Sequence, residues 1–328
     1  MASAQTLPDT ASGTPSDTAF SWRAGWRYGL MGLPLAFVAL PLYVLLPNHY
    51  ARNFGLSLAS LGALLLAVRL FDTVIDPWLG RWTDRLFAHS TARVLAWGAL
   101  AAALLCTGFA LMFFPPQALT QSPDQGLLLW LGLSLLLTTV AFSALSILHQ
   151  AWGARLGGNE AKRSRVVAWR EGLGLAGVVL ASISPVAIGL PATTAILMIV
   201  SVAAWLAWRA GPTPMQKSQL TPQLATQFAP QSTPGGSPGL QMPLQPTARV
   251  ASPSSVWQPW AHPGFRALMA VFMLNGIASA VPATLILFFV QDRLQAPASM
   301  EPLFLGSYFV CAALALPLWL KVVKRIGL

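Results

Sequence analysis

The sequence predicts an all-α polytopic membrane protein, and three observations support this fold class. Of the 328 residues, 55% are hydrophobic and 9% are charged, whereas soluble domains carry about 25% charged residues. The mean hydropathy is +0.59. Eight apolar runs are long enough to cross about 30 Å of hydrocarbon as helices. They lie at residues 28–47, 56–79, 94–114, 127–150, 166–190, 192–208, 267–290 and 303–320.

The distribution of Lys and Arg predicts the topology of these helices. Sixteen of these residues lie before the first run or after even-numbered runs, and only Arg52 and Arg293 lie in the other connections. The positive-inside rule therefore predicts a multi-pass protein of the inner (plasma) membrane with both termini cytoplasmic. Because topology accounts for the net charge of +10, no nucleic-acid partner is expected. Residues 1–20 lack a basic segment followed by a short apolar core, so we expect no cleaved signal peptide.

Composition divides the chain into four regions. Residues 1–27 are expected to form a disordered cytoplasmic N-terminus, and residues 28–210 a bundle of six transmembrane helices. Residues 211–263 are rich in Pro, Gln and Ser, which is typical of a disordered cytoplasmic linker. Residues 264–328 contain only two helices, which we expect to stand alone beside the bundle. Two six-helix halves joined by a long loop are common in secondary transporters, so we expect the chain to be truncated.

The second apolar run contains three charged residues. Charged side chains at bilayer depth cost at least a few kcal/mol each. Arg69, Asp72 and Asp76 project from one side of a helix, within about 60° of one another. One interpretation is a structural ion pair between Arg69 and Asp72 that locks helices together. The other is a cation site, because two carboxylates four residues apart can ligate Na⁺ or carry a proton, with Arg69 balancing the charge of the empty site.

A second charged set opens the fifth run, in the segment VVAWREGLGLAG. Adjacent residues on a helix point about 100° apart, so we expect Arg170 and Glu171 to point in different directions, one toward a cavity and the other toward a neighbouring helix. An interfacial anchor near the cytoplasmic end is the alternative interpretation. The glycines at positions 172, 174 and 177 are expected to allow close helix packing.

Three further residues are candidates for contact with a substrate. His149 and Trp152 lie near the cytoplasmic mouth of the fourth run, where a packing histidine and an interfacial tryptophan are the alternatives. Asn275 lies inside the seventh run, which also contains a proline, and this indicates a kinked, gating helix. Cys106 and Cys311 lack metal-ligand spacing and are expected to be inert packing residues.

Several motifs occur in a fixed order along the chain. YGL opens the first run, VRLFDTVIDPWLG covers residues 68–80, and a Gly-x-x-x-Asp-Arg loop covers residues 80–85. Arg170 lies early in the fifth run, and LNGIASAVPATLILFFV covers residues 274–290. In this order the motifs resemble those of the glycoside-pentoside-hexuronide:cation symporters, the melibiose-permease branch of the major facilitator superfamily. The resemblance extends from residue 28 to the last residue, apart from the linker.

The resemblance implies a fold, a function and a set of functional residues. The implied fold is that of the major facilitator superfamily, with a six-helix N-terminal bundle and the first two helices of a C-terminal bundle. The implied function is symport of a small organic solute with H⁺ or Na⁺ by alternating access. The implied functional residues are the cation ligands Asp72 and Asp76 with their ionic partner Arg69, the cavity residue Arg170, and a conformational latch of Gly80, Asp84 and Arg85.

Three positions depart from the family. The sugar-binding aspartate of the first helix aligns with Ala36, the acidic residue of the fourth helix falls near Ser146, and the asparagine that helps to bind Na⁺ is replaced by Ile75. A pyranoside needs several charged or amide partners for its hydroxyls, so these losses argue against a galactoside. A lipid or another amphiphile is therefore an alternative substrate. The change at Ile75 favours H⁺ as the coupling ion without excluding Na⁺.

Two other classes of function compete with transport. A membrane-embedded enzyme would need a constellation of His, Ser or carboxylate groups at one membrane face, and the four histidines form no recognisable motif with an acid. A truncated remnant without transport activity is the other class. We expect no enzyme activity and no cofactor beyond the coupling ion. The expected partners are a sugar-like solute or an amphiphile and the lipid bilayer, and the protein is expected to be a monomer.

Overall fold

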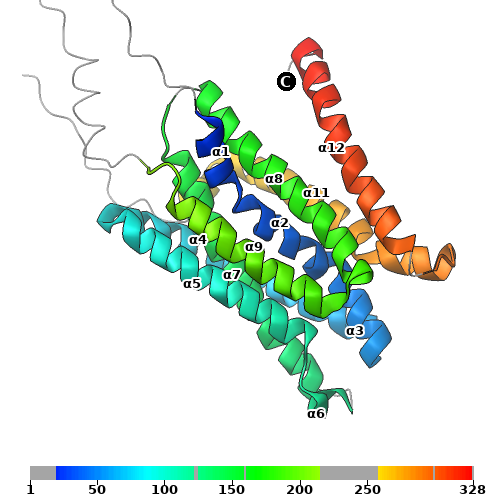
Figure 1. Ribbon diagram of the computed structural model, residues 1–328. Helices are drawn as coiled ribbons and strands as arrows, with labels where there is room; N and C mark the ends of the chain where they lie inside the picture. Colours follow the sequence, from blue (N-terminus) through cyan, green and yellow to red (C-terminus); the bar gives the residue numbers. More distant parts are fainter. Residues whose placement is uncertain (1–19, 122–124, 159, 215–257, 298–299, 327–328) are drawn as a thin grey trace, which may run out of the picture.

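The computed structural model describes residues 20–121, 125–158, 160–214, 258–297 and 300–326 (Figure 1). Within these ranges the chain is helical and contains no strand. The elements, in chain order, are α1 (Trp22–Gly29), α2 (Gly32–Leu40), the π-helix η1 (Pro41–Leu45), α3 (Leu46–Phe54), α4 (Leu58–His89), α5 (Thr91–Phe113), α6 (Gln117–Thr120), α7 (Gln125–Ala154), α8 (Glu160–Ala187), α9 (Gly189–Arg209), the 3₁₀-helix η2 (Gln258–Ala261), α11 (Pro263–Phe288), the π-helix η3 (Phe289–Arg293) and α12 (Glu301–Ile326).

Six segments of the described chain are long and apolar enough to cross a membrane. They are α1 to α3 taken together, α4, α5, α7, α8 and α9, and they coincide with the first six apolar runs. The helices α11 and α12 occupy the seventh and eighth runs. The all-α membrane fold predicted from the sequence is therefore confirmed. Most of the two regions expected to be disordered, residues 1–19 and 215–257, lies outside the described residues.

The first membrane-crossing segment is not one regular helix. The chain turns between α1 and α2, and it changes to a π-helix at Pro41. Proline has no N–H to donate to the preceding turn, so the regular α-helical hydrogen-bond pattern is interrupted there. Gly55 ends α3 with a φ of +69°, a left-handed conformation that glycine adopts without a steric penalty.

The charged helix α4 is 32 residues long, about 48 Å at 1.5 Å per residue. It begins where the hydroxyl of Ser57 accepts a hydrogen bond from the Ser60 amide over 3.0 Å. Because the hydrocarbon core is about 30 Å thick, one end of α4 must project from it. Asp84 and Arg85 lie near that end, and Asp72 lies about 21 Å along the axis from Leu58. Asp72 is therefore inside the membrane-crossing part of α4.

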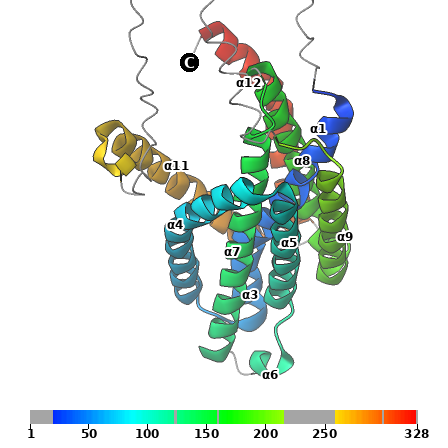
Figure 2. The same ribbon diagram turned by 90° about the vertical axis from the view of Figure 1, so that its left-hand side faces the viewer.

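The membrane-crossing helices pack into a bundle (Figures 1 and 2), in which α5 and α4 lie along α7 and α2 lies along α8. Glycine makes the contact between α2 and α8 possible. A Cβ atom on Gly32 would lie 2.4 Å from the backbone oxygen of Arg170, and one on Gly177 would lie 2.2 Å from that of Leu33. The packing role expected for Gly177 is therefore confirmed. A Cβ on Gly172 would meet no atom within 4 Å, so this glycine has no such role.

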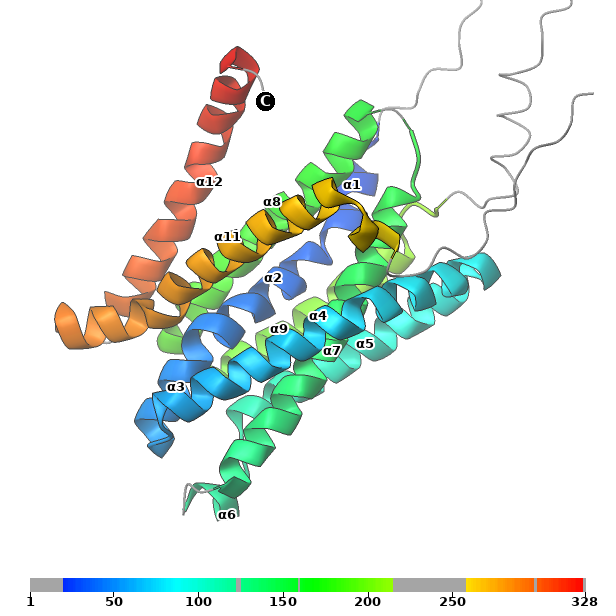
Figure 3. The same ribbon diagram turned by 180° about the vertical axis from the view of Figure 1, so that it is seen from behind.

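The helices α11 and α12 contact the bundle at one end only. We call this the Gly55 end, after the α3–α4 connection, and the opposite end the Asp84 end. At the Gly55 end α12 packs on α8, and Leu287 of α11 is 1% exposed. Nearer the Asp84 end Leu274 and Leu314 are 68% and 74% exposed, and α12 leans away from the bundle (Figure 3). The expectation that these helices stand alone is wrong, because apolar side chains at their Gly55 end are buried against η1 and α8.

Candidate cation and substrate sites

A cluster of polar side chains lies in the middle of α4, on the face that the sequence predicted. Asp72 is 7% exposed, and the Ser143 hydroxyl in α7 donates a hydrogen bond to its Oδ1 over 2.6 Å. Arg69 Nη1 lies 3.4 Å from Asp72 Oδ2 and donates to Tyr43 Oη of η1 over 2.7 Å. We refer to Tyr43, Arg69, Asp72, Asp76 and Ser143 as the Asp72 cluster. It lies where α4, α7 and η1 meet.

Asp76 has an unsatisfied hydrogen-bonding group. This residue is one turn beyond Asp72 on α4 and is partly buried. Its Oδ1 is fully buried and forms no hydrogen bond with the described residues. Leaving a buried acceptor without a partner costs about 1–3 kcal/mol, and more for a charged group. A proton or a bound cation at this oxygen would remove that cost.

The charges of the Asp72 cluster are unequal. Two carboxylates and one guanidinium leave one negative charge when all three groups are ionised. Binding of one proton or one monovalent cation therefore neutralises the cluster. The acceptors are carboxylate and hydroxyl oxygens, hard ligands that suit H⁺ or Na⁺ better than a soft transition metal. Arg69 also stacks 4.8 Å from the centre of the Tyr43 ring, which fixes the position of its charge.

The sequence identified three members of the Asp72 cluster and missed two. Arg69, Asp72 and Asp76 lie together on α4, as helical spacing predicts, and their functional roles stay predictions. Tyr43 and Ser143 come from other helices. Each shares its apolar run with at least one other hydroxyl residue. Its hydroxyl is a weak signal, because serine in a membrane helix often donates to its own backbone.

The pair Arg170 and Glu171 lies on α8, and the sequence predicted its geometry incorrectly. Arg170 Nη2 is 2.8 Å from Glu171 Oε1, so the two charged groups turn toward each other. The side chains of adjacent residues leave a helix about 100° apart. Arg170 and Glu171 are both long enough for their charged ends to meet in spite of this angle. Arg170 also lies against α2, at the position where a Cβ of Gly32 would be 3.1 Å from its Cγ. None of the contacts found among the described residues joins this pair to the Asp72 cluster.

His149 and Trp152 are packed between helices in this structure, and their role as substrate contacts stays a prediction. His149 is fully buried, its Nε2 donates to the Tyr28 backbone oxygen over 2.9 Å, and the two rings stack at 4.3 Å. Tyr28 Oη in turn donates to the His149 backbone oxygen over 3.2 Å. Trp152 is 1% exposed, and its Nε1 donates to the Pro212 backbone oxygen over 2.9 Å. These contacts hold α1 and the residues after α9 against α7.

Asn275 lies on α11, in a stretch between Leu268 and Ile277 where most side chains are exposed. Its helix contacts η1 and α3 only near the Gly55 end. The structure therefore places Asn275 on an exposed stretch of α11, and its role as a substrate contact stays a prediction.

The predicted latch at the end of α4 has a partner that the sequence did not identify. Arg155 of α7 donates to Asp84 Oδ1 over 2.6 Å, and its guanidinium lies 4.1 Å from the centre of the Phe87 ring. Arg85 is exposed, and a Cβ on Gly80 would meet no atom within 4 Å. Asp84 therefore ties the end of α4 to the end of α7. From the sequence alone, Arg155 is one of the sixteen basic residues that predict the topology.

A six-helix bundle with a charged cluster buried on a membrane-crossing helix defines a class of protein, the polytopic membrane transporters. Comparison with known proteins identifies the family. The model of the family described as "MFS/sugar transport protein" matches residues 27–210, more than half of the chain. The protein therefore belongs to the MFS/sugar transport family, and the resemblance to the glycoside:cation symporters is confirmed.

A curated relative points in the same direction. The protein named "Putative glycoside/cation symporter YagG", from Escherichia coli (strain K12), is 29% identical over 152 residues. The match covers 46% of this chain and 32% of the relative. The matched region thus spans about a third of the relative's length.

Proposed function

We propose that the protein is a cation-coupled secondary transporter that moves a small organic solute by alternating access. The observation that carries this proposal is the Asp72 cluster. Its net negative charge and the unpartnered oxygen of Asp76 create a place for one cation or proton inside the membrane-crossing part of α4. A purely structural ion pair would need only Arg69 and Asp72, and it would leave Asp76 unexplained. The name of the E. coli relative, a glycoside/cation symporter, supports the same function.

We propose H⁺ as the coupling ion, with Na⁺ as the alternative. The Asp72 cluster offers carboxylate and hydroxyl oxygens, and the side chain at Ile75 adds none. A proton needs only one acceptor oxygen, whereas a metal ion needs several ligands. The absence of an oxygen ligand at Ile75 therefore supports a proton site. No other cofactor is proposed.

We propose a sugar-like solute as the substrate, with a lipid or another amphiphile as the second candidate. One contact favours the second candidate. Ala36 aligns with the sugar-binding aspartate of the family and is apolar. It lies at the α2–α8 contact, where a Cβ added to Gly174 would be 3.5 Å from the Cβ of Ala36. An apolar side chain at this position offers no partner to a pyranoside hydroxyl and suits an amphiphile better. Arg170 is kept as a substrate contact, and Gly80, Asp84 and Arg85 as the latch.

The remaining parts of the proposal concern the setting of the protein. We propose that it works as a monomer in the inner membrane, with both termini cytoplasmic. The lipid bilayer and the transported solute are its partners, and no nucleic acid takes part.

The test is transport by the protein reconstituted into liposomes, with a solute library and imposed Na⁺ or pH gradients. The variants Asp72→Asn and Asp76→Asn should abolish uphill accumulation, because an amide neither carries the proton nor supplies negative charge to a cation. A proton-coupled protein should respond to pH and ignore Na⁺, and a sodium-coupled one should do the reverse. Downhill exchange should survive in both variants.

The matched control is Thr73→Val, which removes a hydroxyl next to Asp72. That hydroxyl donates to the Arg69 backbone oxygen over 2.9 Å and takes no part in the cluster, so uphill transport should persist. Full accumulation by both Asp→Asn variants would refute the cation site. Loss of folded protein in both variants, with unchanged coupling in what remains, would support the structural ion pair instead.

A further inference from the structure

Polar side chains join the first membrane-crossing segment to η3 and α12 at the Gly55 end. Asn48 Nδ2 of α3 donates to Gln291 Oε1 over 2.9 Å, and Gln291 Nε2 donates to Glu301 Oε1 over 2.6 Å. Asn48 and Glu301 are both 7% exposed. An ion pair between Arg52 of α3 and Asp292 of η3 lies beside them. We call these five residues the Gln291 clasp.

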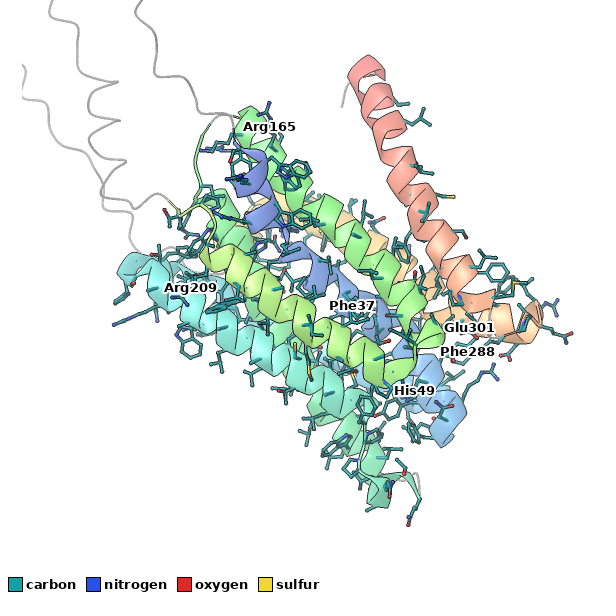
Figure 4. All side chains as sticks on the ribbon, viewed as in Figure 1. Phe37, His49, Arg165, Arg209, Phe288 and Glu301 are labelled. Atoms are coloured by element: carbon teal, nitrogen blue, oxygen red, sulfur yellow. The ribbon has the colours of Figure 1, made fainter. Side chains whose placement is uncertain are left out.

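The Gln291 clasp connects parts of the chain that are far apart in sequence. Its hydrogen bond from Asn48 to Gln291 and its ion pair from Arg52 to Asp292 both join α3 to η3. The Arg52 guanidinium also lies 5.8 Å from the centre of the Phe288 ring at the end of α11. In Figure 4, Glu301 and Phe288 are labelled at the Gly55 end of the molecule, and Arg165 and Arg209 at the opposite end.

The interface next to the clasp is closed to solutes. Glu301 lines a cavity of about 20 Å³ together with side chains of α2, η1, α8, α11 and α12, among them Leu40, Val44, Ser182 and Leu287. A cavity of this volume has room for about one water molecule. A solute larger than water therefore has no path between α8, α11 and α12 here.

Toward the Asp84 end, described side chains of α11 and α12 are exposed instead of packed against the bundle. Phe272 of α11 is 71% exposed and Leu318 of α12 is 65% exposed. Both helices are thus fixed to the bundle at one end and separate from it at the other. This geometry is that of a gate closed on one side of the membrane and open on the other.

We propose that the Gln291 clasp is the gate that closes the Gly55 end of the protein. This inference rests on the proposed transport function, since a gate has meaning only for a protein that moves a solute. Hydrogen bonds to a charged group such as Glu301 are among the stronger ones in proteins. The same groups bind water when the end opens, so the net stabilisation per bond is small. A few such bonds can therefore hold the gate closed and still release it.

The experiment measures access to the closed interface with one cysteine. Ser182 is 3% exposed at the α8–α12 contact, where a Cβ on Gly306 would be 3.6 Å from its hydroxyl oxygen. The probe protein carries Ser182→Cys with Cys106→Ala and Cys311→Ala, and a membrane-impermeant maleimide is added to either side of sealed vesicles. Gln291→Leu removes the hydrogen bonds that join Gln291 to Asn48 and Glu301. It should raise the labelling rate from the side of the Gly55 end by about tenfold or more.

A second variant pair covers the case in which Gln291→Leu does not fold. Arg52→Glu places two acidic groups together and should also accelerate labelling. The double variant Arg52→Glu with Asp292→Arg restores the opposite charges and should return the rate toward that of the parent. The matched control is Asn53→Leu, because the Asn53 amide contacts His49 Nδ1 over 2.8 Å within α3 and does not bridge to η3. Its labelling rate should match that of the parent.

Equal labelling rates in the parent, Gln291→Leu and Arg52→Glu would overturn the gate. A rise in Asn53→Leu as large as that in Gln291→Leu would also overturn it, because the effect would then be a general loosening of α3. Failure of the proposed function gives a different result. In that case the labelling rates respond to the clasp as expected, but the reconstituted parent moves no solute under any ion gradient.

Discussion

At the scale of single residues, buried polar groups in this protein fall into two kinds. Tyr28 and His149 exchange hydrogen bonds and stack on each other, so their partners are fixed by the fold. The carboxylate of Asp72 accepts hydrogen bonds from Arg69 and Ser143, but Asp76 keeps a buried oxygen without a hydrogen-bond partner. The first kind stabilises a contact between helices. The second kind costs free energy unless a ligand binds. His49, Thr83, His149 at Nδ1, Ser184, Ser201 and Trp208 also keep such an atom. What distinguishes Asp76 is its place beside a second carboxylate and an arginine.

Ser143 provides a test of the cation site at this scale. Removing its hydroxyl in Ser143→Ala deletes the 2.6 Å hydrogen bond to Asp72. This bond stabilises the ionised carboxylate by about 1.5–3 kcal/mol, so its loss should strengthen proton binding by about tenfold or more. The ion concentration for half-maximal transport measures the effect. Ser134→Ala is the control, because Ser134 donates only to backbone oxygens of α7. An unchanged ion dependence in Ser143→Ala would remove Ser143 from the site.

His149 provides a test of the packing role. His149→Phe keeps an aromatic ring but loses the hydrogen bond to the Tyr28 backbone oxygen, so the protein should lose about 1–3 kcal/mol of stability. Thermal unfolding in detergent measures this loss as a lower midpoint. The substrate concentration for half-maximal transport should stay unchanged in the folded protein. A large rise in that concentration, without a loss of stability, would return His149 to the substrate site.

At the scale of secondary-structure elements, the irregular first segment and the glycines of α2 and α8 determine how the bundle packs. The segment from α1 to α3 contains a turn and a π-helix, and Tyr43 lies in that π-helix, where it contacts Arg69. The backbones of α2 and α8 approach so closely that Gly32 and Gly177 have no room for a side chain. The Asp72 cluster lies elsewhere in the bundle, where α4, α7 and η1 meet.

The glycines of α8 provide a paired test of this packing. Gly177→Val would push a side chain into the Leu33 backbone, which can move away only with the whole helix α2. We expect a loss of about 3 kcal/mol and a lower yield of folded protein. Gly172→Ala meets no atom within 4 Å and should change the stability by less than about 1 kcal/mol. Similar unfolding midpoints for the two variants would show that the α2–α8 contact is looser than described.

At the scale of the whole molecule, the two ends differ in charge and in closure. Connections at the Gly55 end carry Arg52 and Arg293, whereas the other basic residues outside the membrane-crossing runs lie at the Asp84 end in the part of the chain that the structure describes. Arg52 takes part in the Gln291 clasp, so one of the two exceptions to the charge distribution has a structural role. The positive-inside rule predicts that the Asp84 end is cytoplasmic. The gate proposed here would then close the external side.

Topology reporters test this orientation directly. Fusions at Gly157, in the α7–α8 connection, and in the linker between α9 and α11 should report a cytoplasmic location. A fusion at Gln121, before α7, should report an external one. An alkaline-phosphatase and fluorescent-protein pair gives opposite signals on the two sides. Phosphatase activity at Gly157 together with fluorescence at Gln121 would invert the assignment, and with it the side that the clasp closes.

The sequence alone determined the fold class, the positions of the membrane-crossing helices and the shared face of Arg69, Asp72 and Asp76. Each depends on local information. Hydropathy over about 20 residues decides whether a segment enters the bilayer, and the pitch of the helix decides which residues of one segment share a face.

Only the tertiary structure decided the partners of those residues. Ser143 and Tyr43 at Asp72, Arg155 at Asp84 and Gln291 between Asn48 and Glu301 all come from other segments. The pairing of Arg170 with Glu171 was also undetermined, because side-chain rotamers lie beyond helical pitch. Contacts between segments depend on the rotation and depth of each helix in the bundle. Those are set by packing details, such as the missing side chains of Gly32 and Gly177, that no single segment encodes.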